Sequence, residues 1–309
     1  MKTFVALGLI CAAQVACSSS KPNSNFENNN GTDSGAGINN PPPPGDDSGS
    51  VIFDNDGGSS STDGGSGPTS NVITATIRDF KFYDPNDPTT NADFEHPPKV
   101  DAQGNPSLSG PWPDTGIVTN TLGTDGKPVY ETATPTTYTT HGKASFDQWF
   151  RDVPGTNINV QYPITLSRNS NGSFGYSSLV SGVPLDPNTD PTKMFFPIDD
   201  STPFKTAFGN QGKLHNYSFT VEIHTLFTYH GGETFDFSGD DDVFVYINNA
   251  LVINLGGIHD AEKKSVQLDA LALTKGQQYP LDFFSVERHT YGSNITFSTT
   301  LGLITAPPR

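Results

Sequence analysis

The sequence predicts an all-β sandwich with one short helix, preceded by a long polar segment. Three observations indicate this class. From Val72 onward, short runs alternate apolar and polar residues, β-branched and aromatic residues are concentrated in those runs, and Gly, Pro and Asn separate them. This pattern is typical of a sandwich in which each strand buries one face. Examples of the runs expected to form strands are 72–77, 158–162, 218–226, 243–247, 251–255 and 294–301.

Two connections between these runs can also be assigned. Asn248 and Asn249 separate two strands, and we expect a tight hairpin there because Asn tolerates positive φ. The segment 84–113 is rich in Pro and Asn. It is expected to be a long loop that shapes one rim of the domain.

One short helix is expected around residue 146. Ser145 is placed to cap it, and Gln148 would complete a Ser-x-x-Gln capping box. Phe146, Trp149 and Phe150 would then share one helical face. We expect these aromatic side chains to pack into a core rather than to stack on a ligand.

The first 17 residues resemble an export signal, with Lys2 at its positive end and an apolar stretch over 4–13. Ala16 followed by Cys17 resembles a lipoprotein cleavage site, which predicts lipidation of Cys17. Gln14 departs from that pattern, and the alternative is an ordinary signal peptide. The apolar run is shorter than the roughly 20 residues that span a bilayer. The expectation is an exported protein, either an outer-membrane lipoprotein facing outward or a secreted one.

Residues 18–71 consist almost entirely of Ser, Asn, Gly, Pro and Asp, which predicts a disordered linker. A coil of this length has a root-mean-square reach of roughly 40 Å. The expected organisation is therefore a signal peptide over 1–17, a tether over 18–71 and one β domain over 72–306. Both cysteines lie in the leader, so no disulfide is expected after cleavage.

The chain of 309 residues carries a formal net charge of -16 and has a pI near 4.6. Such acidity disfavours nucleic acid and anionic lipid as partners, because both would be repelled. Membrane association is expected only through the N-terminal lipid anchor.

The run Asp240, Asp241 and Asp242 directly precedes an alternating strand. Adjacent carboxylates repel one another, and a hard divalent cation such as Ca²⁺ would compensate them with its preference for oxygen ligands. The alternative is a solvated acidic loop that only joins two strands.

A series of short sequence motifs resembles the fibro-slime domain. This family is a bacterial and slime-mould relative of the anthrax protective-antigen-type domain, which fungal adhesins use as a calcium-dependent lectin. The likeness spans roughly residues 72–304. The motifs that carry this likeness lie at 77–80, 93–95, 126–130, 146–155, 235–248, 251–259, 283–289 and 293–294.

The resemblance implies a site for one Ca²⁺ ion in a protective-antigen-like β-sandwich of jelly-roll type. It places Asp240 and Asp241 at a pair of metal ligands joined by a cis peptide. Glu287 falls where the related lectins have Asn, so it would add a charge, occupy coordination that a sugar hydroxyl would use, or pair instead with Arg288. Asn294 is a further candidate ligand, as is a backbone carbonyl near His289.

Several other residues are candidates for contacting a ligand beside the ion. His259 follows two glycines that would let its side chain approach the acidic run. The other candidates are Asp242, His289, Tyr291 and Tyr229. Zinc is disfavoured because His224 and His230 have no obvious third partner and the chain has no His-Glu-x-x-His motif.

Three functions are consistent with these features. The leading one is a surface-tethered, calcium-dependent module that binds a glycan or extracellular polysaccharide. The alternatives are a non-catalytic structural or protein–protein interaction module with a stabilising calcium, and an accessory domain of a glycoside hydrolase. No catalytic residues are assigned, because no hydrolase motif is present. An enzyme is therefore not expected.

Overall fold

A computed structural model describes residues 70–96, 113–131, 137–178, 195–199, 207–290 and 292–305. The leader with Cys17, nearly all of the 18–71 segment, and Tyr291 lie outside the described residues. The described elements are β1 (Ser70–Phe80), α1 (Lys143–Phe146), β2 (Asn157–Arg168), β3 (Phe174–Ser177), β4 (Phe219–Thr228), β5 (Thr234–Gly239), β6 (Asp242–Ile247), β7 (Ala250–Leu255), β8 (Glu262–Gln267), the 3₁₀ turn η1 (Leu268–Ala270), β9 (Gln278–Glu287), β10 (Ile295–Thr299) and β11 (Ile304–Thr305).

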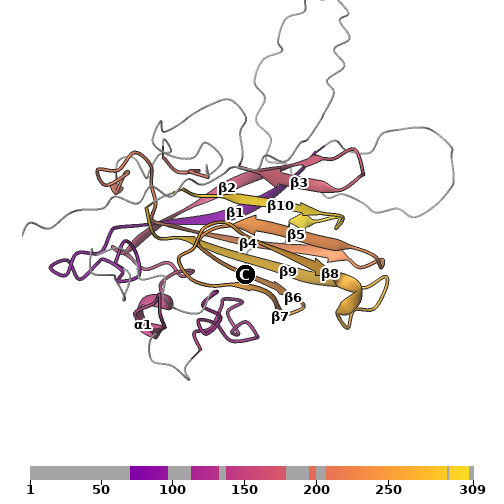
Figure 1. Ribbon diagram of the computed structural model, residues 1–309, viewed down its shortest axis with the longest axis horizontal. Helices are drawn as coiled ribbons and strands as arrows, with labels where there is room; N and C mark the ends of the chain where they lie inside the picture. Colours follow the sequence, from indigo (N-terminus) through magenta and orange to yellow (C-terminus); the bar gives the residue numbers. More distant parts are fainter. Residues whose placement is uncertain are drawn as a thin grey trace, which may run out of the picture. The chain divides into compact units, whose positions relative to one another are not determined.

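The described strands form one continuous antiparallel sheet in the order β7-β6-β9-β4-β1-β2-β3-β10-β5-β8, with β11 paired to β4 (Figure 1). The sheet folds over on itself, because the ring of Phe237 in β5 lies 5.5 Å from that of Phe283 in β9. The predicted all-β sandwich is thereby confirmed. Among the described residues, no helix is long and apolar enough to cross a membrane.

Strand β6 is buried on both faces. Val243, Val245 and Ile247 point into the main core between the two layers. Phe244 and Tyr246 point the other way, into a second cluster with Phe80, Phe94, Phe146, Trp149 and Phe150. The period-two alternation of a strand produces this division. The acidic run therefore lies at the start of a strand that packs on both of its faces.

The second cluster confirms that Phe146, Trp149 and Phe150 are core residues, since none of them is exposed. The predicted cap is wrong. Helix α1 begins at Lys143 with Gly142 at its N-cap, and no side chain caps it. The side chain of Gln148 is engaged elsewhere, because the Asn91 amide donates to its Oε1 at 2.9 Å and also to the carbonyl of Ser145 at 2.8 Å.

The predicted hairpin between β6 and β7 is confirmed, with Asn248 and Asn249 at φ 51° and 63°. The described part of the predicted 84–113 loop contains no helix or strand, and it is tied into the second cluster. Phe94 stacks on Phe80 at 4.3 Å, and the buried Asp93 carboxylate accepts hydrogen bonds from the indole of Trp149 and the backbone N–H of His141. Residues 97–112 lie outside the described part.

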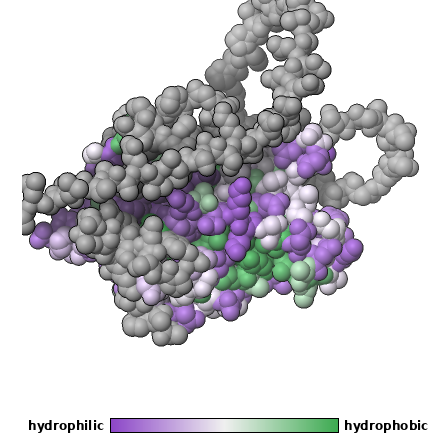
Figure 2. Space-filling model, in the orientation of Figure 1, coloured by the Kyte–Doolittle hydropathy of each residue, from purple (hydrophilic) through white to green (hydrophobic). Residues whose placement is uncertain are grey.

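Apolar side chains of the described residues are mostly enclosed. Val72, Tyr138 and Leu214 are the large hydrophobic residues among them that are clearly exposed. Figure 2 shows one face of the molecule, on which hydrophilic residues border a hydrophobic area.

Candidate functional site

The acidic run is buried. Asp240 and Asp241 connect β5 to β6 and are each 5% exposed, and Asp242 is fully buried as the first residue of β6. The solvated-loop alternative is therefore wrong. The peptide between Asp240 and Asp241 is cis, as the resemblance implies.

Backbone N–H groups from three separate segments orient the first two carboxylates. The N–H of Asn294 donates to Oδ1 of Asp240. Asp241 accepts from the N–H of His259 at Oδ1 and from the N–H of Arg288 at Oδ2, both at 3.2 Å. Such bonds fix the direction of a carboxylate while leaving lone pairs on its oxygens for a further ligand.

Glu287 ends β9 and joins this acidic group. It is 3% exposed, and its Oε2 has no hydrogen-bond partner. Burial raises the pKa of Glu287 well above its usual value, and repulsion from Asp241 and then from Asp240 raises it further. Burial also raises the pKa of Asp241 to about 6, although the positive charge of Arg288 opposes this. These carboxylates are therefore close enough to destabilise one another's charge.

The donor set fits a hard cation. Three buried carboxylates repel one another, one buried oxygen lacks a partner, and a cation with oxygen ligands would relieve both costs. As the side chains stand, no three His, Cys, Asp or Glu residues of the described ranges converge on one metal position. Coordination would therefore require carboxylate torsions to change on binding.

Asn294 takes part mainly through its backbone. Its N–H and carbonyl both bond to Asp240, while its side-chain oxygen lies 3.5 Å from the Thr296 hydroxyl. Asn294 therefore lies beside the acidic pair, and its side-chain amide is turned toward β10.

The assignment of Asp242 as a ligand-contacting residue is wrong. Its Oδ2 lies 2.6 Å from Arg288 Nε, and its Oδ1 lies 3.2 Å from Arg288 Nη2 and accepts the N–H of Gly257 at 2.6 Å. Arg288 is equally buried; its Nη1 donates to the carbonyl of Thr139, and its guanidinium lies 5.2 Å from the Trp149 ring centre. The same pair excludes the Glu287–Arg288 alternative, because Arg288 points to the opposite face of its strand.

His259 and His289 both lie at the site. The N–H of His259 binds Asp241, and its ring nitrogens lie 2.8 Å from the carbonyl of Asp260 and 3.2 Å from that of Leu255. His289 follows Glu287 by two residues, and its Nδ1 lies 3.4 Å from Oε2 of Glu95.

The assignment of Tyr229 is wrong. It follows the last residue of β4, whereas Phe219 at the start of β4 pairs with Glu287. Ten residues of strand correspond to about 30 Å. Tyr229 is also 4% exposed and donates to Asp269 at 2.8 Å. The remaining candidate, Tyr291, cannot be placed, because it lies outside the described residues.

Sequence reasoning missed Glu95. Its backbone N–H donates to the carbonyl of Arg288 at 2.9 Å, and its Oε2 lies 3.3 Å from the hydroxyl of Thr290. Its negative charge contributes to the raised pKa of Glu287. The sequence did mark this region, because the motif at 93–95 was part of the family resemblance. Nothing in the sequence, however, placed Glu95 against the end of β9.

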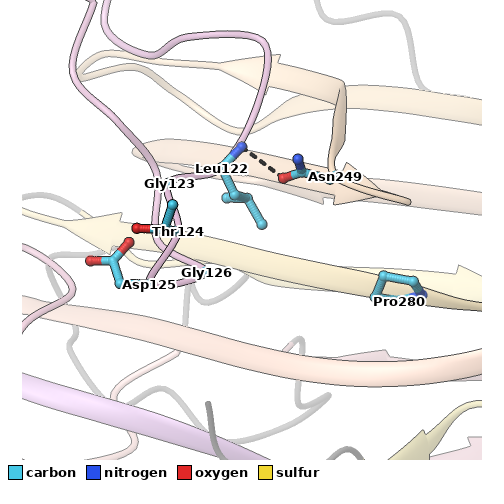
Figure 3. A pocket seen from close by; sticks show the side chains of 7 residues that line it. All are labelled: Leu122, Gly123, Thr124, Asp125, Gly126, Asn249 and Pro280. Carbon is cyan, nitrogen blue, oxygen red and sulfur yellow. Dashed lines mark hydrogen bonds between the residues drawn. The ribbon is translucent and has the colours of Figure 1, made fainter.

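One pocket of the described residues lies away from the acidic group. It has a volume of about 290 Å³ and is shown in Figure 3. Pro280, which lines it, precedes Glu287 by seven residues along β9, so the pocket is at the other end of that strand. Its one charged side chain, Asp125, forms an ion pair with Arg151 at 2.8 Å. The residues that line it are Leu122, Gly123, Thr124, Asp125, Gly126, Asn249 and Pro280.

Residues 184–306 match the model of the PA14 domain. This range contains the acidic run and Glu287 but not Glu95. The match supports the broader part of the resemblance, since the PA14 domain is related to the protective-antigen domain. The fibro-slime designation stays a prediction.

Curated relatives come from Dictyostelium discoideum. Protein psiR is 41% identical over 231 residues, which cover 74% of this chain and 21% of psiR. Protein psiD is 41% identical over 194 residues, covering 60% of this chain and 36% of psiD. Protein psiC is 37% identical over 247 residues, covering 76% of this chain and 42% of psiC. The chain thus spans between about a fifth and two fifths of these relatives.

Two solved structures are also similar to parts of the chain. The PA14 domain of the MpAFP antifreeze protein is 15% identical with a TM-score of 0.22, and the alignment covers 28% of this chain and 45% of that one. The PA14 sugar-binding domain from an RTX adhesin is 11% identical with a TM-score of 0.23, covering 33% and 63%.

Proposed function

We propose that this chain is a calcium-dependent glycan-binding module whose cation is held by Asp240, Asp241 and Glu287. The observation that carries the proposal is the buried acidic group itself, in which Oε2 of Glu287 has no partner. The PA14 match over 184–306 supports it, because the related domain of fungal adhesins is a calcium-dependent lectin.

The chain's own groups prepare the site in two ways. Backbone N–H groups of His259, Arg288 and Asn294 hold the Asp240 and Asp241 carboxylates in place. The buried Arg288–Asp242 pair fixes the strand beneath them. When bound, Ca²⁺ would supply positive charge to this group and coordination positions for hydroxyl oxygens of a sugar. His259, which is partly exposed, is the side chain best placed to contact that sugar.

The proposal extends to how the module is presented. Lipidation at Cys17 and the polar 18–71 segment would hold the domain away from an outer membrane, where it could reach an extracellular polysaccharide. Ordinary cleavage of the leader would instead release a secreted form.

A glycan array tests the ligand directly. The full chain is applied with calcium and again with a chelator, and D241N is applied with calcium. We expect binding to a restricted set of glycans that is lost with the chelator and in D241N. A blank array under all conditions, with calcium still binding the protein, would favour the structural module in which the ion only stabilises the sandwich.

A further inference from the structure

We infer that Asp79 is the titrating group of a pH-sensitive latch that holds the segments 195–199 and 207–217 against the end of β1. The latch consists of Asp79, Asn216 and Asp199. The inference does not depend on the binding of calcium or of a glycan. It assigns a role to a buried carboxyl that the proposed cation site does not use.

Asp79 lies near the end of β1 and only one of its carboxyl oxygens is hydrogen-bonded. The residue is fully buried, and its Oδ1 accepts a hydrogen bond from the side-chain amide of Asn216 at 2.7 Å. Its Oδ2 is buried and has no hydrogen-bond partner among the described residues. Ionisation would place negative charge on that oxygen at a cost in free energy, whereas the protonated carboxyl avoids this cost.

The positive charges near Asp79 are directed elsewhere. Arg78 points to the opposite face of β1, where it pairs with two other carboxylates at 2.6 and 2.8 Å. Lys81 lies beyond the end of β1 and binds a carboxylate and a hydroxyl of the following loop. Lys213, on the 207–217 segment, lies 5.9 Å from the centre of an aromatic ring.

The other groups packed around Asp79 also leave its charge without compensation. The strands on either side of β1 place apolar residues opposite it. Among the titratable groups of the two held segments, Asp199 Oδ2 lies 2.5 Å from Nδ1 of His215, and Tyr217 packs edge-on against the Phe196 ring at 5.1 Å. Burial therefore raises the pKa of Asp79 from its usual 3.8 to about 7, although its hydrogen bonds oppose this rise.

Asn216 connects this carboxyl to both segments. Its backbone N–H donates to Oδ1 of Asp199 at 2.7 Å, and its side-chain oxygen accepts the N–H of Ser218 at 2.9 Å. Its side-chain amide, which donates to Asp79, also donates to the carbonyl of Gly209 at 3.3 Å. A change at Asp79 therefore acts on both segments through one side chain.

The 195–199 segment also borders the acidic group of the proposed cation site. The N–H of Phe195 donates to the carbonyl of Ser293 at 2.6 Å. Ser293 directly precedes Asn294, whose N–H binds Asp240. Release of the latch would therefore loosen a segment that contacts the chain beside this group.

The direction of the pH effect follows from the raised pKa of Asp79. The closed latch favours the protonated carboxyl, so this contribution to its stability is complete below pH 3.8 and is lost as the pH rises through about 7. The latch should therefore be closed in mildly acidic solution and should open more often in mildly alkaline solution.

Hydrogen exchange of the full chain from about pH 5 to about pH 8 tests the inference, with chelator present and with correction for the intrinsic pH dependence of exchange. We expect the protection of backbone amides at 209–218 to fall at least about tenfold more than that of β4 amides. In D79N, whose side chain can still accept the bond from Asn216, this difference should disappear. D236N removes an exposed carboxyl and should behave as the wild type does.

Three results would overturn the inference. They are an equal pH dependence at 209–218 in wild type and D79N, protection there that does not change with pH in the wild type, and an equal fall in β4, which would mean that the whole domain opens. If D79N does not fold, carboxyl ¹³C NMR of the wild type still decides. Asp79 should titrate near pH 7, and a pKa at or below 3.8 would overturn the inference. Loss of calcium binding alone would count only against the calcium proposal.

Discussion

Arg288 and Asp242 form a fully buried ion pair with two contacts, Nε to Oδ2 at 2.6 Å and Nη2 to Oδ1 at 3.2 Å. The pair links the start of β6 to the end of β9. Asp241 directly precedes Asp242 and Glu287 directly precedes Arg288, so the pair joins the two chain segments that carry these carboxylates of the candidate site. The positive charge of Arg288 opposes the rise in the pKa of Asp241, whereas the negative charge of Asp242 adds to it.

Removing the arginine should destabilise the domain strongly. R288M leaves Asp242 buried without its counter-charge, and we expect a loss of about 3–5 kcal/mol in the free energy of unfolding. Denaturant unfolding measures it. R151Q is the control, because the Arg151–Asp125 pair is partly exposed and should contribute at most about 1 kcal/mol. Equal losses in the two variants would show that the buried pair has no special role.

Replacing Glu287 should have opposite effects on stability and on metal binding. In the presence of a chelator, E287Q removes one buried negative charge from a repelling group, so the variant should be more stable than the wild type near neutral pH. The same change should weaken calcium binding. Thermal unfolding with and without calcium gives both results. D236N, at an exposed position of β5, should change stability by no more than about 0.5 kcal/mol. A less stable metal-free E287Q would contradict the repulsion.

Stability of the metal-free protein should fall as pH rises. The pKa of Asp241 is raised from its usual 3.8 to about 6 in the folded state, so folding favours the protonated carboxyl. Its stabilising contribution is complete below pH 3.8 and is lost as the pH passes through about 6. Glu287, whose pKa is also raised, extends the loss to higher pH.

Chelator-treated protein unfolded in denaturant across this pH range checks the prediction. Saturating calcium should flatten the profile, because the cation stabilises the charged carboxylates. D241N should lose the part of the slope that Asp241 contributes. A metal-free stability that rises with pH between 3.8 and about 6 by the same amount in wild type and D241N would contradict the assignment.

Gly239 has no room for a side chain beside the acidic pair. A Cβ there would lie 2.5 Å from the carbonyl of Asn294 and 2.5 Å from the ring of Phe237. G239A should therefore push β5 away from β10, destabilise the domain and weaken calcium binding, as calorimetry and thermal unfolding would show. G302A meets nothing within 4 Å and serves as its control. Wild-type calcium affinity in G239A would show that this close approach does not position the site.

The strands β3, β5, β8, β9 and β11 lie outside the alternating runs named from the sequence. The features that local sequence could predict were β1, β2, β4, β6, β7 and β10, the β6–β7 hairpin and the acidic pair. Each depends on alternation, turn residues or adjacency along the chain. The Ser145 cap failed because Asn91, distant in sequence, engages Gln148. Tyr229 failed because it lies at the opposite end of β4 from the residue paired with Glu287.

The rest of the site depends on which strands lie together. Asp242 could be separated from Asp241 only once the β6–β9 register placed Arg288 against it. Glu95 reaches the site through its backbone bond to Arg288 and its side-chain contacts with Thr290 and His289. Neither relationship has a signature in the spacing of the residues involved.

Calcium calorimetry on the full chain and on D241N tests the central claim most directly. We expect one Ca²⁺ per wild-type chain, with a higher unfolding midpoint when it is bound, and no measurable binding or shift in D241N. At a hundredfold excess over the dissociation constant, the stabilisation should reach about 2.7 kcal/mol. A wild-type chain whose unfolding is the same with calcium and with chelator, and which releases no heat on titration, would contradict the claim.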